Sequence, residues 1–253
     1  MKRFFTILFA SAAIMAASTT ASAQYFDHVS LGVGVGLDGV SLQAAAPIGS
    51  ILQLRLGGSY MPPIGYSFTA KNIEFQPGET IDLDLRAQAC MRAFNAMLDL
   101  FPGKETTFRF SFGMFAGPGT LVTLFNTKPY LEESEWGNEG IQIGDTFIST
   151  DDKGISRINA DVAKVMPYFG IGAGRAVNAN KAVSFCFDLG VCYSGGIGIW
   201  THGTNTKTWK DDYIRITSTD IKNFGGDDMG IIDKLGNIPV LPLMKFSLFF
   251  RLF

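Results

Sequence analysis

The sequence predicts an all-β fold, a closed antiparallel transmembrane β-barrel of eight strands with up-and-down topology, and ten strands are the alternative. Three observations lead to this fold class. Apolar residues recur with a period of two in eight separate segments, which is the pattern of strands whose two faces differ. The links between these segments are alternately short and long. The chain also begins with the composition of a secretory signal peptide.

The start of the chain carries the three parts of a signal peptide. Lys2 and Arg3 precede an apolar run from Phe4 to Ala17, and Ala21-Ser22-Ala23 supplies a cleavage pattern of small residues. The apolar run is shorter than the roughly 20 residues that a membrane-spanning helix needs. We therefore expect a signal peptide at residues 1–23, cleaved after Ala23, followed by one barrel domain at residues 24–253.

Eight segments show the alternation. In the segment 29–37 every second residue is Val or Leu, and the residues between them are Ser30 and glycines. The predicted strands span residues 29–37, 40–46, 52–59, 81–92, 108–115, 165–172, 183–193 and 244–253. Since successive side chains of a strand point to opposite faces, each strand would have one apolar face and one polar or glycine-lined face.

The links between the strands favour a membrane barrel over a soluble sandwich. Links 47–50, 102–105 and 175–181 are short, whereas links 61–79, 118–162 and 195–238 are long. Outer-membrane barrels have short turns on the periplasmic side and long loops outside. The first outer link is an exception, because Leu37-Asp38-Gly39 has the Asp-Gly signal of a tight hairpin. Segments 141–150 and 155–163 flank Asp151 like a further hairpin, and segment 213–217 has strand character, which keeps ten strands open.

Charged residues are distributed unevenly between the two predicted faces. The net charge of −2 excludes a basic surface for nucleic acid. Arg or Lys on the lipid face near the membrane centre costs about 2–4 kcal/mol, so the strand charges should point inward. These residues are Arg55, Asp82, Asp84, Arg86, Arg92, Arg109, Asp188, Lys245 and Arg251. Because buried charges need partners, we expect an internal network of ion pairs and water, with Asp188 and Lys245 as one candidate pair.

The interior and the outer surface have further sequence features. Eight strands enclose a space that side chains can fill, so we expect a filled barrel, while the inward glycines leave a small cavity as the alternative. The terminal strand would face lipid through Met244, Phe246, Leu248, Phe250 and Leu252, with Phe253 at its end. Aromatic residues fall where strands should meet headgroups: Tyr25, Phe26, Tyr60, Phe101, Tyr193, Trp200 and Phe253.

Residues for catalysis or metal binding are sparse. Cys90, Cys186 and Cys192 read as small side chains inside the barrel, and the last two are too far apart on one strand to be bridged. His28 and His202 match no catalytic spacing. The pairs Asp151-Asp152, Asp211-Asp212 and Asp227-Asp228 lack the spacing of a calcium loop, and turn formation explains them. We predict no catalytic residues, no metal and no cofactor.

The chain resembles the small outer-membrane β-barrels of Gram-negative bacteria, the OmpA-like and OmpX-like proteins of the porin family. The resemblance rests on the glycine-rich first hairpin at 32–46, the turn Leu100-Phe101-Pro102-Gly103-Lys104 and the terminal Phe253. It implies an outer-membrane location, without an appended peptidoglycan-binding domain. It also implies three kinds of partner: outer-membrane lipid, the periplasmic chaperone and barrel-assembly machinery, and an unknown extracellular ligand.

Three functions are compatible with these features. The first is a structural or surface-interaction protein whose long loops, which hold Trp136, Trp200 and Trp209, contact something outside the cell. The second is a narrow channel or carrier for small solutes, which the glycine-lined and basic interior suggests. The third is a hydrolase at the outer rim that uses His202.

Overall fold

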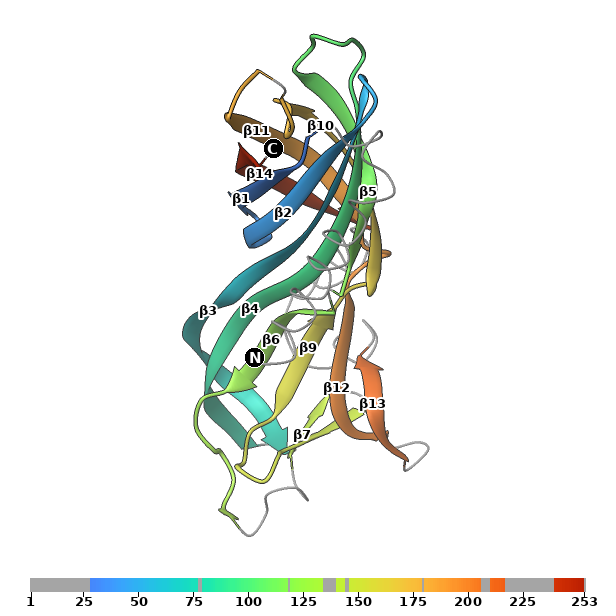
Figure 1. The fold of residues 1–253 in the computed structure, drawn as a ribbon. Helices are drawn as coiled ribbons and strands as arrows, with labels where there is room; N and C mark the ends of the chain where they lie inside the picture. The colour runs from blue at the N-terminus through green and yellow to red at the C-terminus, as the bar shows by residue number, and fades with distance from the viewer. Residues whose placement is uncertain are drawn as a thin grey trace.

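In the computed structural model the described part of the chain is one large antiparallel sheet (Figure 1). The structure describes residues 28–76, 79–117, 119–133, 140–143, 146–178, 180–205, 210–216 and 239–252. No helix in this part has the length and apolar character to cross a membrane. The strands are β1 (Ser30–Gly36), β2 (Gly39–Ile48), β3 (Leu52–Gln76), β4 (Glu79–Leu100), β5 (Phe108–Ala116), β6 (Thr120–Asn126), β7 (Gly140–Ile143), β8 (Thr146–Ser149), β9 (Arg157–Asp161), β10 (Val165–Ala173), β11 (Val183–Tyr193), β12 (Gly198–Asn205), β13 (Lys210–Ile216) and β14 (Val240–Arg251).

Eight of these strands close into a ring, which we call the ring throughout. In order they are β1, β2, β3, β4, β5, β10, β11 and β14, and each pairs with the next. The last strand returns to the first, with Ser30 opposite Arg251 and Gly36 opposite Lys245. All eight pairings are antiparallel, and neighbours in the ring follow the order of the chain. The prediction of eight closing strands rather than ten is therefore confirmed.

One end of the ring holds the three short links, the start of β1 and the end of β14. The links are residues 49–51, 101–107 and 174–182. The backbone N–H of Leu252 donates to the carbonyl of Val29 at 2.8 Å, which ties the last strand to the first at this end. Arg175 joins the three links, because its guanidinium donates to the carbonyls of Ser50, Gly103 and Thr106 at 2.8 to 3.2 Å.

The opposite end of the ring continues into a second body of sheet, which we call the extension. β3 and β4 run from the ring into it (Figure 1). After short breaks β6 follows β5 and β12 follows β11, while β9 precedes β10. Gly117 has φ 99° at the first break, and Gly195 and Gly196 have φ 72° and 95° at the third, values that favour glycine. Among the residues that the structure describes, those predicted as long loops are thus mostly in strands.

The predicted hairpin around Asp151 is wrong. β8 pairs with β7 and with β12, while β9 pairs with β6 and with β12. β12 supplies the partner for both strands because residues 198–201 face β9 and residues 203–205 face β8. Local sequence pattern favours the nearest neighbour in the chain, whereas the sheet joins β9 and β12 over 37 to 43 residues and β8 and β12 over 55 to 59 residues.

Four charged residues of β4 that were predicted to point inward lie on its outer face. This strand runs on to Leu100 without a bulge of its own, and its odd-numbered side chains point inward along its whole length. In the ring these are Ala93, Asn95, Met97 and Asp99. Asp82, Asp84, Arg86 and Arg92 have even numbers and lie on the outer face of the extension, so their placement inside was wrong. The reason is that the apolar side chains of this half of β4, such as Leu83, form the core of the extension, which leaves the polar face outside.

Candidate functional site

The centre of the ring holds a buried layer of four charged side chains. Arg55 on β3 contacts Asp99 on β4 at 2.7 Å and Asp188 on β11 at 2.9 Å. Arg109 on β5 contacts the same Asp188 at 2.6 Å and Asp99 at 3.5 Å. Ser111 donates its hydroxyl to Asp99 at 2.7 Å. Two guanidinium groups and two carboxylates thus neutralise one another, which offsets the cost of removing them from water.

A second ion pair lies inside the ring beside this layer. Lys245 Nζ on β14 is 2.6 Å from Asp38 Oδ2, and both side chains are 1% exposed. Asp38 belongs to the tight turn between β1 and β2, which folds its carboxylate inward. The predicted pair of Asp188 with Lys245 is wrong, although the two residues are directly opposite on β11 and β14. Asp188 instead accepts from both guanidinium groups, since two planar donors satisfy its oxygens better than one ammonium.

Apolar side chains close the ring on both sides of the charged layer. Toward the extension, Phe115 and Met166 are 0% exposed and pack with Met97, Tyr168 and Leu243. Toward the short links, the 174–182 link folds inward. Its Ala176 and Val177 pack against Ala45, Cys186 and Phe249. Gln53 on β3 fixes this link, because its amide donates to the carbonyl of Val177 at 2.8 Å.

Several inward glycines of the ring are covered by large neighbouring side chains. A methyl group at Gly32 would lie 2.5 Å from the Phe249 ring, and one at Gly172 would lie 3.0 Å from the Arg109 guanidinium. Gly190 makes room for Tyr168 in the same way. Glycine therefore serves here to admit a bulky partner, and at these positions it leaves no cavity of the kind that the glycine pattern had suggested.

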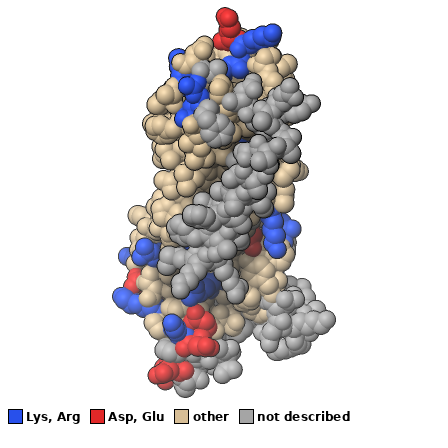
Figure 2. Space-filling model, viewed as in Figure 1, with Lys and Arg blue, Asp and Glu red and all other residues tan. Residues whose placement is uncertain are grey.

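The outer surface of the ring is apolar. Along the terminal strand, Met244, Phe246, Leu248, Phe250 and Leu252 are 39 to 55% exposed. Phe253 lies outside the described residues. β11, with 11 residues, spans about 33 Å along the strand at roughly 3.3 Å per residue, or about 25 Å along the axis at a tilt of about 40°. In the view of Figure 2 the charged residues gather toward the two ends of the molecule, with an uncharged band between them.

The interior contains functional residues that the sequence reasoning missed. Asp99 and Asn95 are both 0% exposed on β4, beyond the predicted end of that strand. The signal was present, since the alternation continues from residue 93 to residue 100. Asp38 was read as a turn residue only. Of the predicted charges, Arg55, Arg109, Asp188 and Lys245 are buried within the ring, and Arg251 lies at its short-link end, where it donates to the carbonyl of Asn178 at 3.4 Å.

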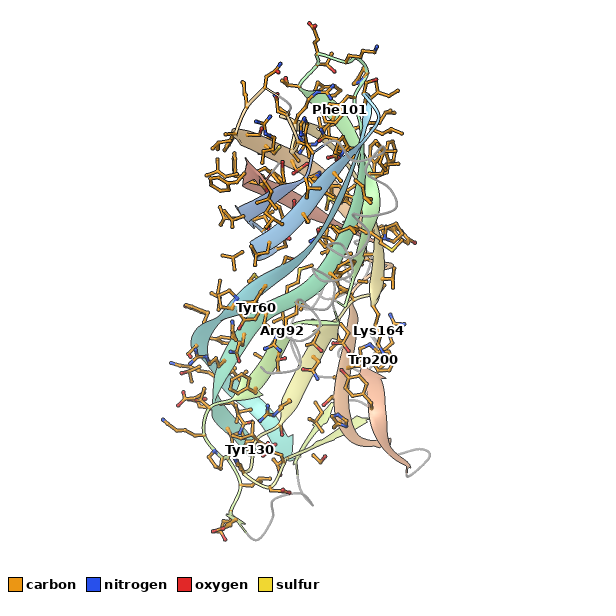
Figure 3. The ribbon with its side chains drawn as sticks, in the orientation of Figure 1. Tyr60, Arg92, Phe101, Tyr130, Lys164 and Trp200 are labelled. Carbon is orange, nitrogen blue, oxygen red and sulfur yellow. The ribbon has the colours of Figure 1, made fainter. Side chains whose placement is uncertain are left out.

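The aromatic residues divide between the two ends. Tyr60 and Tyr193 are 40% and 55% exposed where the ring meets the extension. Phe101 is 1% exposed, so its predicted place at a lipid surface is wrong. It lies beneath Arg175, whose guanidinium carbon is 4.0 Å from the ring centroid (Figure 3). Burial lowers the pKa of Arg175.

The remaining candidate residues are the acidic pairs and the cysteines. Burial alone would raise the pKa of Asp151, but its carboxylate accepts from the backbone of Ile155 and Lys153 and from Arg157, which lowers the pKa overall. Among the described residues no three His, Cys, Asp or Glu side chains gather as metal ligands. Asp227 and Asp228 lie outside the described residues, as do the side chains of Asp211 and Asp212. The three cysteines are free thiols, with Cys186 and Cys192 inside the ring and Cys90 on the outer face of β4.

Comparison with known proteins gives a likeness to three solved structures. No protein-family model and no curated protein matches the chain. CarO of Acinetobacter baumannii is 12% identical, with a TM-score of 0.47, over 87% of this chain and 96% of that one. CarO2 of the same organism is 14% identical, with a TM-score of 0.45, over 88% and 98%. A major outer membrane protein from Thermus thermophilus is 13% identical, with a TM-score of 0.41, over 88% and 98%. At these scores the function has to be argued from the chain's own geometry.

Proposed function

We propose that the ring is the membrane-spanning part of an outer-membrane β-barrel, and that it anchors an extracellular extension which contacts molecules outside the cell. The apolar outer surface and the charged interior support the membrane placement, because hydrocarbon tolerates the first and excludes the second. The estimated 25 Å height of the apolar surface is close to the apolar band of about 25 Å of such barrels. The short links and both chain ends would then face the periplasm.

The same proposal includes how the chain reaches the membrane. Residues 1–23 would act as a signal peptide that is removed after Ala23. Periplasmic chaperones and the barrel-assembly machinery would receive the exported chain, and outer-membrane lipid would surround the ring. A boiled and an unboiled sample should run at different positions on a gel, because a closed barrel resists detergent until it is heated. Equal mobility would contradict the barrel.

The closed interior is the observation that favours an anchor over a channel. The four charged side chains of the central layer are 0 to 2% exposed and bind one another directly. A solute would have to separate these ion pairs, and breaking a buried pair costs about 3–5 kcal/mol. It would also meet the apolar layer around Phe115 on one side and the inserted Val177 on the other.

Planar-bilayer recording tests this conclusion. The purified protein should insert without a stable open level across a range of voltages. A double variant, Asp188→Asn with Asp99→Asn, removes both carboxylates from the central layer and provides the comparison, since any current that it carries must pass through the ring. A reproducible open level in the unmodified protein would instead favour the channel or carrier.

A further inference from the structure

Three aromatic rings form a rigid wall on the outer face of the extension. Trp200 and His202 on β12 lie on either side of Tyr213 on β13. The Trp200 and Tyr213 rings are stacked, with centroids 5.3 Å apart and planes 8° apart. The His202 ring is 4.9 Å from Tyr213. These three residues, which we call the aromatic wall, share the face that carries Arg86 on β4, because pairing across β6, β9 and β12 keeps their side chains in register.

Polar neighbours hold the aromatic wall in place. The Tyr213 hydroxyl donates to Asp161 at 2.7 Å, and the Asn159 amide donates to that hydroxyl at 3.3 Å. Trp200 lies over Gly198, where a methyl group would be 2.6 Å from the indole nitrogen. A wall of this kind is organised before any ligand arrives, so little rotamer freedom would be lost on binding.

Two exposed cations lie between the aromatic wall and the ring. Arg92 is opposite Tyr60 in the β3–β4 pairing, and its guanidinium carbon is 5.4 Å from the Tyr60 ring centroid. The backbone N–H of Gly117, in the next strand position, donates to the carbonyl of Lys164 at 2.8 Å. Arg92 lies on β4 and Lys164 directly precedes β10, the two strands on either side of β5, so their backbones are roughly 10 Å apart across two strand spacings, and both side chains are exposed. Figure 3 shows Tyr60 and Arg92 on one side of the view and Lys164, with Trp200 just below it, on the other.

We propose that this face binds the phosphorylated sugar headgroup of an outer-leaflet glycolipid, lipopolysaccharide. The inference rests on the proposed membrane placement, which puts Arg92 and Lys164 at the headgroup level. Guanidinium and ammonium groups bind phosphate oxygens. The C–H face of a sugar is attracted to the negative face of an aromatic ring, and polar groups nearby take its hydroxyls. Phosphates at the acyl boundary and sugars beyond them match the order from ring to extension, because Trp200 pairs with Asn159, which lies further into the extension than Lys164.

The test uses folded protein in detergent and fluorescently labelled lipopolysaccharide, with and without phosphatase treatment. Arg92→Gln combined with Lys164→Gln should weaken binding of the phosphorylated form about tenfold, since charge-assisted hydrogen bonds are lost. The loss should largely vanish with the dephosphorylated form. Trp200→Leu should weaken both forms, and Trp200→Phe should restore most of the binding. The matched control is Lys104→Gln with Lys181→Gln, which removes two exposed cations from the short-link end.

Three outcomes would overturn the proposal, and a separate measurement tests the membrane placement. Binding by the Arg92 and Lys164 double variant that equals the unmodified protein would overturn the proposal, as would an equal loss in the Lys104 and Lys181 control. Full displacement by millimolar inorganic phosphate, with no effect of Trp200→Leu, would mean a bare phosphate site and would also overturn it. Flotation with vesicles tests the membrane placement separately. A protein that binds the glycolipid in detergent but does not float would refute the proposed function and leave the site intact.

Discussion

In both halves of β4 the odd-numbered side chains point inward. The inward face is polar in the half that belongs to the ring and apolar in the half that belongs to the extension. In the ring half, residues 93–100, the inward positions include Asn95 and Asp99, and the outward ones are Phe94, Ala96, Leu98 and Leu100. In the extension half, residues 81–92, the inward positions include Leu83 and Leu85, and the outward ones include Asp84 and Arg86. No bulge of β4 separates the halves. The medium outside the strand therefore decides which face is apolar, and the reversal locates the border near Arg92.

The two interiors differ accordingly. In the ring, side chains such as Arg55 and Asp188 pair at the centre, and an apolar layer closes each side. In the extension, Leu83, Ile148 and Ile216 form an apolar core that Ile158 and Ile199 extend. The ring thus depends on ion pairs that are buried away from water, whereas the Lys128–Asp84 and Arg157–Asp151 pairs of the extension are exposed. Substitutions of charged residues should therefore have larger effects on stability in the ring than in the extension.

The largest effect is expected for Asp188→Asn. Arg55 and Arg109 would each lose one of their two carboxylate partners in a fully buried layer and keep only Asp99, which should lower the free energy of unfolding by about 3–5 kcal/mol. Asp84→Asn is the matched change in the extension, where the partner Lys128 is 77% exposed, and it should leave stability unchanged within error. Urea unfolding in vesicles measures both. Equal losses of stability would contradict the prediction that the buried charged layer contributes more to stability than an exposed ion pair.

A smaller effect is expected when one cation is moved along the outer face of β4. Leu98→Arg places a charge within the apolar belt and should destabilise the inserted protein by about 2–4 kcal/mol. Gln88→Arg places the same charge on the same face in the extension and should be neutral. Folding yield into lipid vesicles and the urea midpoint give the comparison. If Leu98→Arg left stability unchanged, residue 98 would lie outside the apolar belt, or the ring would not be surrounded by lipid.

The smallest effect concerns Tyr213 in the extension. Burial raises its pKa to about 12, and the hydrogen bond to Asp161 adds to the shift. Because the folded pKa lies above the ordinary value of about 10, the contribution to stability is fully present below pH 10 and is lost as the pH rises toward 12. Absorbance titration at 295 nm of the protein and of Tyr213→Phe isolates this group. A difference curve centred at pH 10 would contradict the buried hydroxyl.

The fold class could be predicted from local pattern, because seven of the eight ring strands have alternation that lies wholly within the ring. Strand β4 was the exception. Its clearest alternation, at 81–92, belongs to the extension. The assumption that every apolar face contacts lipid therefore assigns the inner and outer faces of this segment the wrong way round. The strands of the extension were missed for another reason. Pairs such as Trp200 with Asn159 join distant segments, and no local periodicity reports which segment is the partner.

The site could be predicted only in part, for the same physical reason. Alternation places Arg55, Arg109 and Asp188 on the inward face, yet it does not give the direction in which a long side chain leans. Asp188 and Lys245 are directly opposite, but their partners lie across the interior. Asp38 was not predicted as an interior residue, because turn chemistry accounts for an Asp-Gly pair without any long-range contact.

The pairing of β1 with β14 has a consequence for the time course of folding. It brings Ser30 against Arg251, nearly the full length of the chain apart, and contacts so distant in sequence form slowly because a long loop must close first. We therefore expect the ring to close last at this seam. Lys245 and Asp38 lie beside the seam, so a mismatched approach of the two strands would leave two buried charges without partners, and the ion pair would favour the correct register at that step.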